Sequence, residues 1–352
     1  MKKYTYDPTK MAEYLKRSNV NNLSEQERTD GARVIVDGCM HVKPGEKFLL
    51  IAQNDDQKKL MAKYLEAEAR HLGATVTVMY LNYADLGEGM EPPQIIVDEM
   101  MKNDVILTIL SLAKTQIFAH TKARNKATNE HGARVGFASA LAVRGATIED
   151  VVKERQRTDK VANMMERSKI ARITSFDGTD VTMNIEGRKC ERLRGSMWEK
   201  GEWGGVPNYA EAALAPVEGT TNGKYVINGF FEGVGRVTSP FTWIIKDGRI
   251  LEVVGDGPEA QKCREILAAA DQNGTNIAEL GVATGHMLDD VGLTGTIMDK
   301  MLLGTVHLAC GKNTTFVGGK VDSNIHHDGV STGITLDLDS KKIIEDGKWL
   351  LD

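Results

Sequence analysis

Phe48-Leu49-Leu50-Ile51-Ala52 is a continuous apolar run, and the pattern that follows it decides the fold class of the first half of the chain. A helical pattern extends from about residue 57 to 72, with its apolar residues on one side. Two further apolar runs cover 75–81 and 104–110, and a helix is expected between them over about 93–102. Apolar strands that alternate with amphipathic helices predict a parallel sheet covered on both faces, the doubly wound α/β arrangement.

The second half of the chain has a different pattern, in which paired strands predict hairpins. A charged helix expected from about 147 to 168 leads into it. The elements expected after that helix are hairpins at 170–176 with 180–185 and at 241–245 with 249–254, a helix over about 258–270, and a last hairpin around 337–342. We therefore expect an α/β N-terminal domain over residues 1–168 and an α+β C-terminal domain over 169–352, since domains commonly hold about 150 residues.

Composition and charge limit the partners of the chain. Its 352 residues carry a net charge of −5, which gives no reason to expect nucleic acid or an anionic membrane as a partner. The first residues contain no apolar segment typical of a signal peptide, and nowhere do eighteen apolar residues run together, so we expect a cytoplasmic protein. Its four cysteines are widely scattered, which favours reduced thiols over disulfides. The residues after the first strand, Gln53-Asn54-Asp55-Asp56, contain no glycine and argue against a nucleotide cofactor.

Candidate metal ligands gather near the C-terminus. In Ile325-His326-His327-Asp328, which has the character of a strand, His326 and Asp328 stand two positions apart and share one face. Within the preceding fifty residues come His307, in a glycine-bounded apolar run, and Glu279, flanked by alanine and leucine. Burying these groups without compensation would cost several kcal/mol each, and a divalent cation would supply that compensation. The alternative is that they are solvated at loop ends and close only in sequence.

Three further residues belong to the same question. Glu211 lies between two prolines, in 206–216, where it is either another ligand or an exposed loop acid. His286 and His327 are spare candidates, although His327 would face away from its neighbours on a regular strand. The spacing matches no short metal-binding motif such as His-Glu-x-x-His, so the residues alone predict a metal site without naming its chemistry.

The order of these segments resembles the aminopeptidase T and aminopeptidase S family of metallopeptidases, and the resemblance covers essentially the whole chain. The segments that carry it are 176–180, 207–216, 276–281, 304–309 and 324–328. The resemblance implies an α/β domain beside a metal-carrying C-terminal domain, assembled as a homodimer. It also implies that two divalent cations, zinc, cobalt or manganese, are held by Glu211, Glu279, His307, His326 and Asp328.

The activity implied by this resemblance is metal-dependent hydrolysis of N-terminal residues from peptides. Two cations about 3.5–4 Å apart lower the pKa of a bridging water and polarise the scissile carbonyl group. A carboxylate must also accept the proton of that water, and Glu279 is our candidate for this catalytic role or for bridging the ions. The expected substrate is a peptide or another small molecule.

Two departures favour a second reaction on the same scaffold. The aminopeptidases carry a further acidic ligand shortly before the histidine that matches His307, whereas this chain has Met301-Leu302-Leu303 there, and the spacer from His307 to His326 is short. Both features are similar to a divergent branch that includes 2,5-dihydroxypyridine dioxygenase, which uses one ferrous ion held by two histidines and an aspartate. His326 and Asp328 would serve that chemistry, with His307 or His286 as the third ligand.

The presence of Glu211, Glu279 and His307 together makes the metalloaminopeptidase our main sequence-based prediction. The alternative is a ring-cleaving dioxygenase with one Fe(II), or a ring-opening hydrolase, that acts on a small heterocycle. A binding protein without catalytic activity is a third possibility, although such a protein would have no evident need for the full set of ligands.

Overall fold

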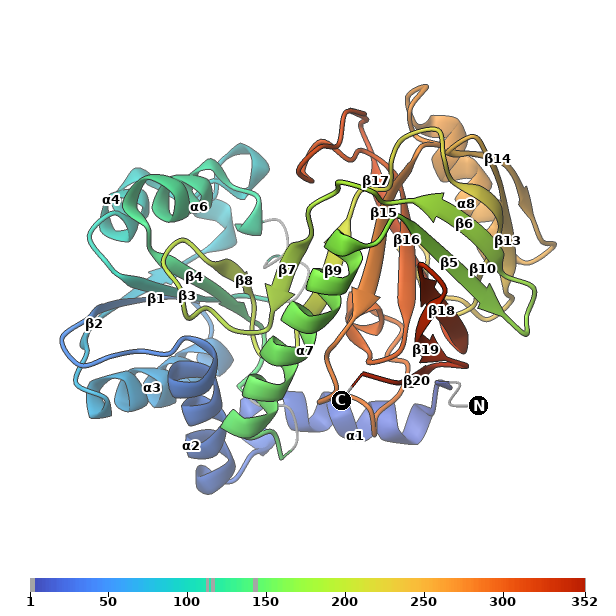
Figure 1. The fold of residues 1–352 in the computed structure, drawn as a ribbon. Helices are drawn as coiled ribbons and strands as arrows, with labels where there is room; N and C mark the ends of the chain where they lie inside the picture. The colour runs from blue at the N-terminus through green and yellow to red at the C-terminus, as the bar shows by residue number, and fades with distance from the viewer. Residues whose placement is uncertain (1–3, 112–113, 115–117, 142–144, 352) are drawn as a thin grey trace. The chain divides into compact units, whose positions relative to one another are not determined.

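The computed structural model describes residues 4–111, 114, 118–141 and 145–351 (Figure 1). The chain divides into two compact units, each built from separate parts of the sequence. We call Ala12–Arg155 with Leu193–Tyr209 the parallel-sheet unit, and Met1–Met11, Gln156–Arg192 and Ala210–Asp352 the antiparallel-sheet unit. The predicted domains over 1–168 and 169–352 stay a prediction, because a compact unit is not evidence of a part that folds alone.

The parallel-sheet unit contains a five-stranded sheet in the order β2-β1-β3-β4-β8, with every pair parallel. Its strands are β1 (Lys47–Gln53), β2 (Thr75–Leu81), β3 (Val105–Ile109), β4 (Arg134–Ala138) and β8 (Trp203–Gly205). In Figure 1, α2 (Glu25–Arg33) and α3 (Asp56–His71) lie on one side of this sheet, and α4 (Gln94–Met100) and α6 (Lys122–Lys126) lie on the other. The predicted α/β fold class is confirmed.

The three central strands of this sheet, β1, β3 and β4, are buried on both faces, as expected of a parallel sheet covered by helices. Every residue of β3 and of β4 is buried. The long helix α3 begins at the N-cap residue Asp55, whose side chain accepts a hydrogen bond from the backbone N–H of Lys58. The other helical segments are α1 (Pro8–Ser18), η1 (Val20–Asn22), η2 (Val34–Cys39), η3 (Tyr83–Asp85), η4 (Glu88–Met90), η5 (Ala127–His131) and α7 (Ile148–Arg167), of which α1 and α7 run through the division between the units.

The antiparallel-sheet unit contains two larger sheets. The eight-stranded sheet has the order β14-β13-β10-β6-β5-β18-β19-β20. Its strands are β5 (Ile170–Ser175), β6 (Asp180–Asn184), β10 (Asn222–Ile227), β13 (Phe241–Lys246), β14 (Arg249–Val254), β18 (Ile334–Leu338), β19 (Lys341–Glu345) and β20 (Lys348–Trp349). The three predicted hairpins are confirmed as β5–β6, β13–β14 and β18–β19, and the predicted helix as α8 (Pro258–Ala269).

The seven-stranded sheet has the order β12-β11-β17-β16-β15-β9-β7. Its strands are β7 (Glu191–Arg194), β9 (Ala210–Leu214), β11 (Phe230–Phe231), β12 (Gly235–Arg236), β15 (Ile277–Ala283), β16 (Val306–Gly311) and β17 (His326–Ser331), and the short helix η6 covers Ile297–Met301. Side chains of both large sheets form one buried core. Tyr225 of β10 ties them together, because its hydroxyl group donates to the carbonyl oxygens of Val306 and Gly329, at 3.0 and 2.9 Å.

Two expectations about the chain as a whole are also tested. In the part of the chain that the structure describes, no helix combines the length and apolar character needed to cross a bilayer. The four cysteines are free thiols, as predicted, and Cys310 is buried in the core.

The register of the seven-stranded sheet places a glycine where a side chain would not fit. Gly281 of β15 stands directly opposite His307 of β16. A Cβ atom at position 281 would lie 2.0 Å from Cε1 and 2.1 Å from Nε2 of the His307 ring. The missing side chain therefore creates the space in which the imidazole lies.

We expect Gly281→Ala to lower the free energy of unfolding by about 1–3 kcal/mol, the usual cost of overpacking a filled interior. Gly87→Ala is the control, because the atom nearest to a Cβ there lies at 3.6 Å, an ordinary contact. Urea unfolding of both variants measures the difference. Equal stabilities would show that the His307 ring moves aside without cost.

Candidate metal centre

The predicted ligands lie on one face of the seven-stranded sheet, because successive side chains along a strand point to opposite faces and these residues fall on matching positions of four neighbouring strands. The residues concerned are Glu211 in β9, Glu279 in β15, His307 in β16, and His326 and Asp328 in β17. The residues between them point to the other face and join the apolar core, among them Leu280, Val282, Val306 and Leu308. The structure therefore brings all five predicted residues together, while their role as ligands stays a prediction.

Small residues leave room for these side chains on the sheet face. Besides Gly281 opposite His307, Asp328 stands opposite Ala309, His326 opposite Gly311, and Glu211 opposite Ala283. Residues directly opposite in a sheet have Cβ atoms about 4.5–5.5 Å apart, so two large side chains there would compete for the same space. The alternation of small and functional residues thus shapes the face that holds the site.

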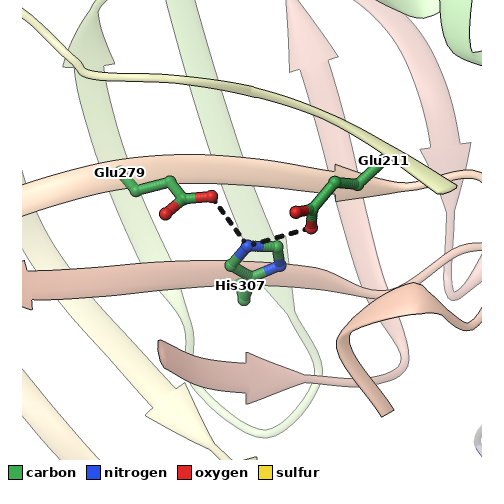
Figure 2. A group of neighbouring side chains, drawn as sticks. All are labelled: Glu211, Glu279 and His307. Atoms are coloured by element: carbon green, nitrogen blue, oxygen red, sulfur yellow. Dashed lines mark hydrogen bonds and ion pairs between the residues drawn. The ribbon is translucent and has the colours of Figure 1, made fainter. Parts of the chain in front are cut away.

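The carboxylate of Glu279 lies between the two histidines. Its Oε1 is 3.0 Å from Nε2 of His307, and its Oε2 is 2.9 Å from Nε2 of His326. On its other side, Nε2 of His307 is 3.4 Å from Oε2 of Glu211, and Figure 2 shows both carboxylates pointing toward this imidazole. Nε2 of His326 is 3.6 Å from Oδ1 of Asp328.

Lys300, on η6, closes the arrangement into a ring. Its Nζ lies 3.3 Å from Oε1 of Glu211 and 3.1 Å from Oδ2 of Asp328. Three carboxylates therefore alternate with two imidazoles and one ammonium group. We call the six side chains the charge ring: Glu211, Lys300, Asp328, His326, Glu279 and His307.

Most of the charge ring is shielded from water, and His326 is its most exposed member. Of the His326 side chain 31% is exposed, whereas the Glu211, Glu279 and Asp328 side chains are 3–4% exposed and that of His307 is fully buried. The Nδ1 of His326 lies 2.7 Å from the carbonyl oxygen of Lys312. Because a carbonyl oxygen can only accept, this contact places the proton of a neutral His326 on Nδ1 and leaves the lone pair of Nε2 for an ion.

Burial and the neighbouring charges shift the pKa values of the acids in different directions. Burial raises the pKa of Glu211, and it outweighs the attraction of Lys300 and His307. Burial acts on Asp328 in the same sense, but Lys300 and His326 hold the pKa of Asp328 well below its usual range. For Glu279, burial and the charge of Asp328 oppose the hydrogen bonds to His307 and His326, which lower its pKa.

The histidines respond to the same negative charge. Burial alone would lower the pKa of each imidazole, but Glu211 raises the pKa of His307, and Asp328 and Glu279 raise the pKa of His326 well above its usual range. The ring of carboxylates therefore attracts positive charge, which protons or a metal ion can supply.

The donor atoms fit a divalent cation. Oε2 of Glu211, Oδ1 of Asp328 and Nδ1 of His307 are buried and receive no hydrogen bond from the described residues. The ligand atoms form two sets, and within each set they lie within 4.8 Å of one another. One set is Glu211, Glu279 and His307, and the other is Glu279, His326 and Asp328. Imidazole nitrogen and carboxylate oxygen suit zinc, manganese and ferrous iron alike. Glu279 belongs to both sets.

The two spare histidines lie outside these sets. The ring of His327 packs 6.1 Å from that of Phe231, because its side chain points to the opposite face of β17, as expected. His286 contacts Nη1 of Arg157 at 3.3 Å through its Nδ1. His307, for its part, groups with Glu211 and Glu279 rather than with His326 and Asp328, so the geometry differs from a simple set of two histidines and an aspartate.

Lys300 is the site residue that the sequence did not reveal. It belongs to a 3-10 helix that lies outside the strands from which ligands were expected. The sequence offers one signal: Lys300 and Asp299 are the two ionisable residues in the otherwise apolar stretch 297–303. An apolar stretch is commonly buried, and a buried lysine almost always has a charged partner, so this position could have been suspected of forming an ion pair.

Comparisons with known proteins place the chain among enzymes. The model of the family described as 2,5-dihydroxypyridine 5,6-dioxygenase matches residues 36–351. No curated protein matches the sequence significantly. The solved structure of 2,5-dihydroxypyridine dioxygenase from Pseudomonas putida KT2440 is similar with a TM-score of 0.71 and 16% identity, covering 94% of this chain and 99% of that one.

The structure of AmpT, the aminopeptidase T of Thermus thermophilus, is similar with a TM-score of 0.66 and 14% identity, covering 93% of this chain and 100% of that one. At such identities the two solved structures show the shared fold alone, whereas the family model spans most of the sequence. The chain therefore belongs to the 2,5-dihydroxypyridine 5,6-dioxygenase family, a family of metal-dependent enzymes, and has the fold of aminopeptidase T.

Proposed function

We propose that this protein is a ring-cleaving dioxygenase that uses one ferrous ion to insert oxygen into a small hydroxylated nitrogen heterocycle. The family match over residues 36–351 carries the proposal. It favours the alternative drawn from the sequence over the metalloaminopeptidase that we placed first. From the sequence we placed the metalloaminopeptidase first because Glu211 and Glu279 are both present together with His307. In the charge ring the two glutamates have another role, since they pair with Lys300 and the histidines.

Glu279, His326 and Asp328 are our candidates for the residues that hold the ion. Their ligand atoms lie within 4.8 Å of one another, and the part of His326 that is exposed gives a substrate access to this set. A bound ferrous ion would supply redox chemistry toward oxygen and open coordination positions for the substrate.

The protein residues around these candidates orient them. The carbonyl oxygen of Lys312 holds His326 so that Nε2 faces the site. Lys300 binds Oδ2 of Asp328 and leaves Oδ1 directed toward His326. The backbone N–H of Asp328 donates to Glu232 at 3.4 Å, which adds a further fixed contact. Ligands held in this way cost less to organise when the ion binds.

A metalloaminopeptidase is the second candidate, and one observation favours it. Glu279 belongs to both sets of ligand atoms, as a carboxylate that bridges two ions would. In that reaction Glu279 would keep the role of bridge or proton acceptor expected from the sequence. In either reaction the substrate is a small molecule or a peptide. The homodimer stays a prediction.

The reaction type can be tested with the purified protein. After anaerobic loading with Fe(II), we expect oxygen uptake in air when 2,5-dihydroxypyridine or a related hydroxylated heterocycle is added. One oxygen molecule should be consumed for each substrate ring that is cleaved, and the loss of the ultraviolet absorbance of the substrate measures the cleavage. We expect no release of aniline from aminoacyl anilides in the presence of zinc, cobalt or manganese. Anilide hydrolysis without oxygen uptake would instead support the aminopeptidase.

The ligand assignment can be tested by substitution. We expect His326→Ala and Asp328→Ala each to weaken metal binding by more than about 100-fold. Substituting residues that only hydrogen-bond to metal ligands typically costs roughly 10–100-fold in affinity, and loss of a ligand itself should cost more. His327→Gln is the matched control, because the side chain of His327 points to the opposite face of β17, toward Phe231. Isothermal titration measures the affinity, and circular dichroism confirms the fold. Wild-type affinity in either alanine variant would contradict the assignment.

A further inference from the structure

Lys300 places a positive charge between one carboxylate of each set of ligand atoms, opposite the shared Glu279 in the charge ring. Its Nζ contacts Glu211 of one set at 3.3 Å and Asp328 of the other at 3.1 Å. Only 10% of its side chain is exposed. A compact ammonium group with three donors can join two carboxylates in this way.

The backbone that carries Lys300 is fixed by its own hydrogen bonds. The fully buried carboxylate of Asp299 accepts from the backbone N–H of Thr294 at 2.6 Å, from the Thr294 hydroxyl group at 2.7 Å and from the backbone N–H of Gly295 at 2.9 Å. The N-cap side chain of Thr296 accepts from the backbone N–H of Met298. The ammonium group is therefore held at the end of a well-braced turn, unlike that of a lysine on a solvated surface.

The charges of the ring balance with one divalent ion. Metal ligands act in their deprotonated form, so Glu211, Glu279 and Asp328 contribute three negative charges and the histidines none. Lys300 reduces the sum to −2, which one divalent ion neutralises. Two such ions would leave a buried excess of +2, and uncompensated buried charge costs several kcal/mol per ion.

The sum counts Lys300 and the carboxylates of the two sets of ligand atoms. Glu232 accepts from the backbone N–H of Asp328 at 3.4 Å and belongs to neither set, so it is not counted.

We propose that the ammonium group of Lys300 takes the place of a second metal cation, so that the centre binds a single divalent ion per subunit. The inference deepens the proposed function and rests on its metal centre, because one ion is what the oxygenase needs. Lys300 acts as a positioning residue: it neutralises Glu211 and orients Asp328 without being a ligand itself.

The number of bound ions tests this inference directly. The apoprotein is titrated with zinc, and the ions per subunit are counted by calorimetry and by elemental analysis. We expect one ion in the wild type and one in Lys300→Arg. In Lys300→Glu the ring would carry four negative charges, so we expect two ions. In Lys300→Met we expect second-site affinity at least about tenfold higher than in the wild type, since tenfold corresponds to only 1.4 kcal/mol.

Lys262→Glu, in α8, is the matched control. It changes the net charge by the same amount, but the Nζ of Lys262 pairs with Glu265 at 3.3 Å and its side chain is 54% exposed. We expect it to bind one ion.

Two results would overturn the inference: a wild type that binds two zinc ions, whether or not the variants fold, or a folded Lys300→Glu that binds only one. A protein that binds one zinc ion but does not consume oxygen would keep this inference and lose the proposed function.

Discussion

Three nearly buried carboxylates on one sheet face impose the electrostatic constraint on which the rest of the site depends. Glu211, Glu279 and Asp328 would repel one another at a free-energy cost of several kcal/mol each if no positive charge lay among them. Two imidazoles and the ammonium group of Lys300 separate them within the charge ring. The remaining negative charge matches one divalent ion, so the metal centre that we propose would stabilise this face as well as provide its chemistry.

The fold by itself does not decide which reaction this site catalyses. The chain shares its fold with a 2,5-dihydroxypyridine dioxygenase and with aminopeptidase T, and a shared fold does not fix the reaction. We therefore infer a single ion from the charges of this chain alone. We propose that Lys300 supplies the positive charge that a second ion would otherwise bring, whereas Glu279 is the carboxylate common to both sets of ligand atoms.

Local patterns in the sequence predicted much of the fold and most of the candidate site. The apolar runs predicted three strands of the parallel sheet, and the alternation in 325–328 placed His326 and Asp328 on one face, because both patterns depend only on neighbouring residues. Two strands of that sheet were missed: β4 has a glycine in the middle of its five residues, and β8 has only three residues, two of them glycine, so neither carries a clear strand signal. Lys300 was missed because its contacts depend on how η6 lies against distant strands. The family match favours the reaction that we placed second from the sequence, because the ligands alone fit both chemistries.

Crystallography of the protein loaded anaerobically with Fe(II) tests the central claim most directly. Diffraction data collected at the iron absorption edge locate each ion independently of any assumption about its ligands. We expect one anomalous peak per subunit, bonded to Nε2 of His326 and to Asp328, with Nζ of Lys300 still between Glu211 and Asp328. Two peaks that share Glu279, or a peak away from the charge ring, would contradict the account.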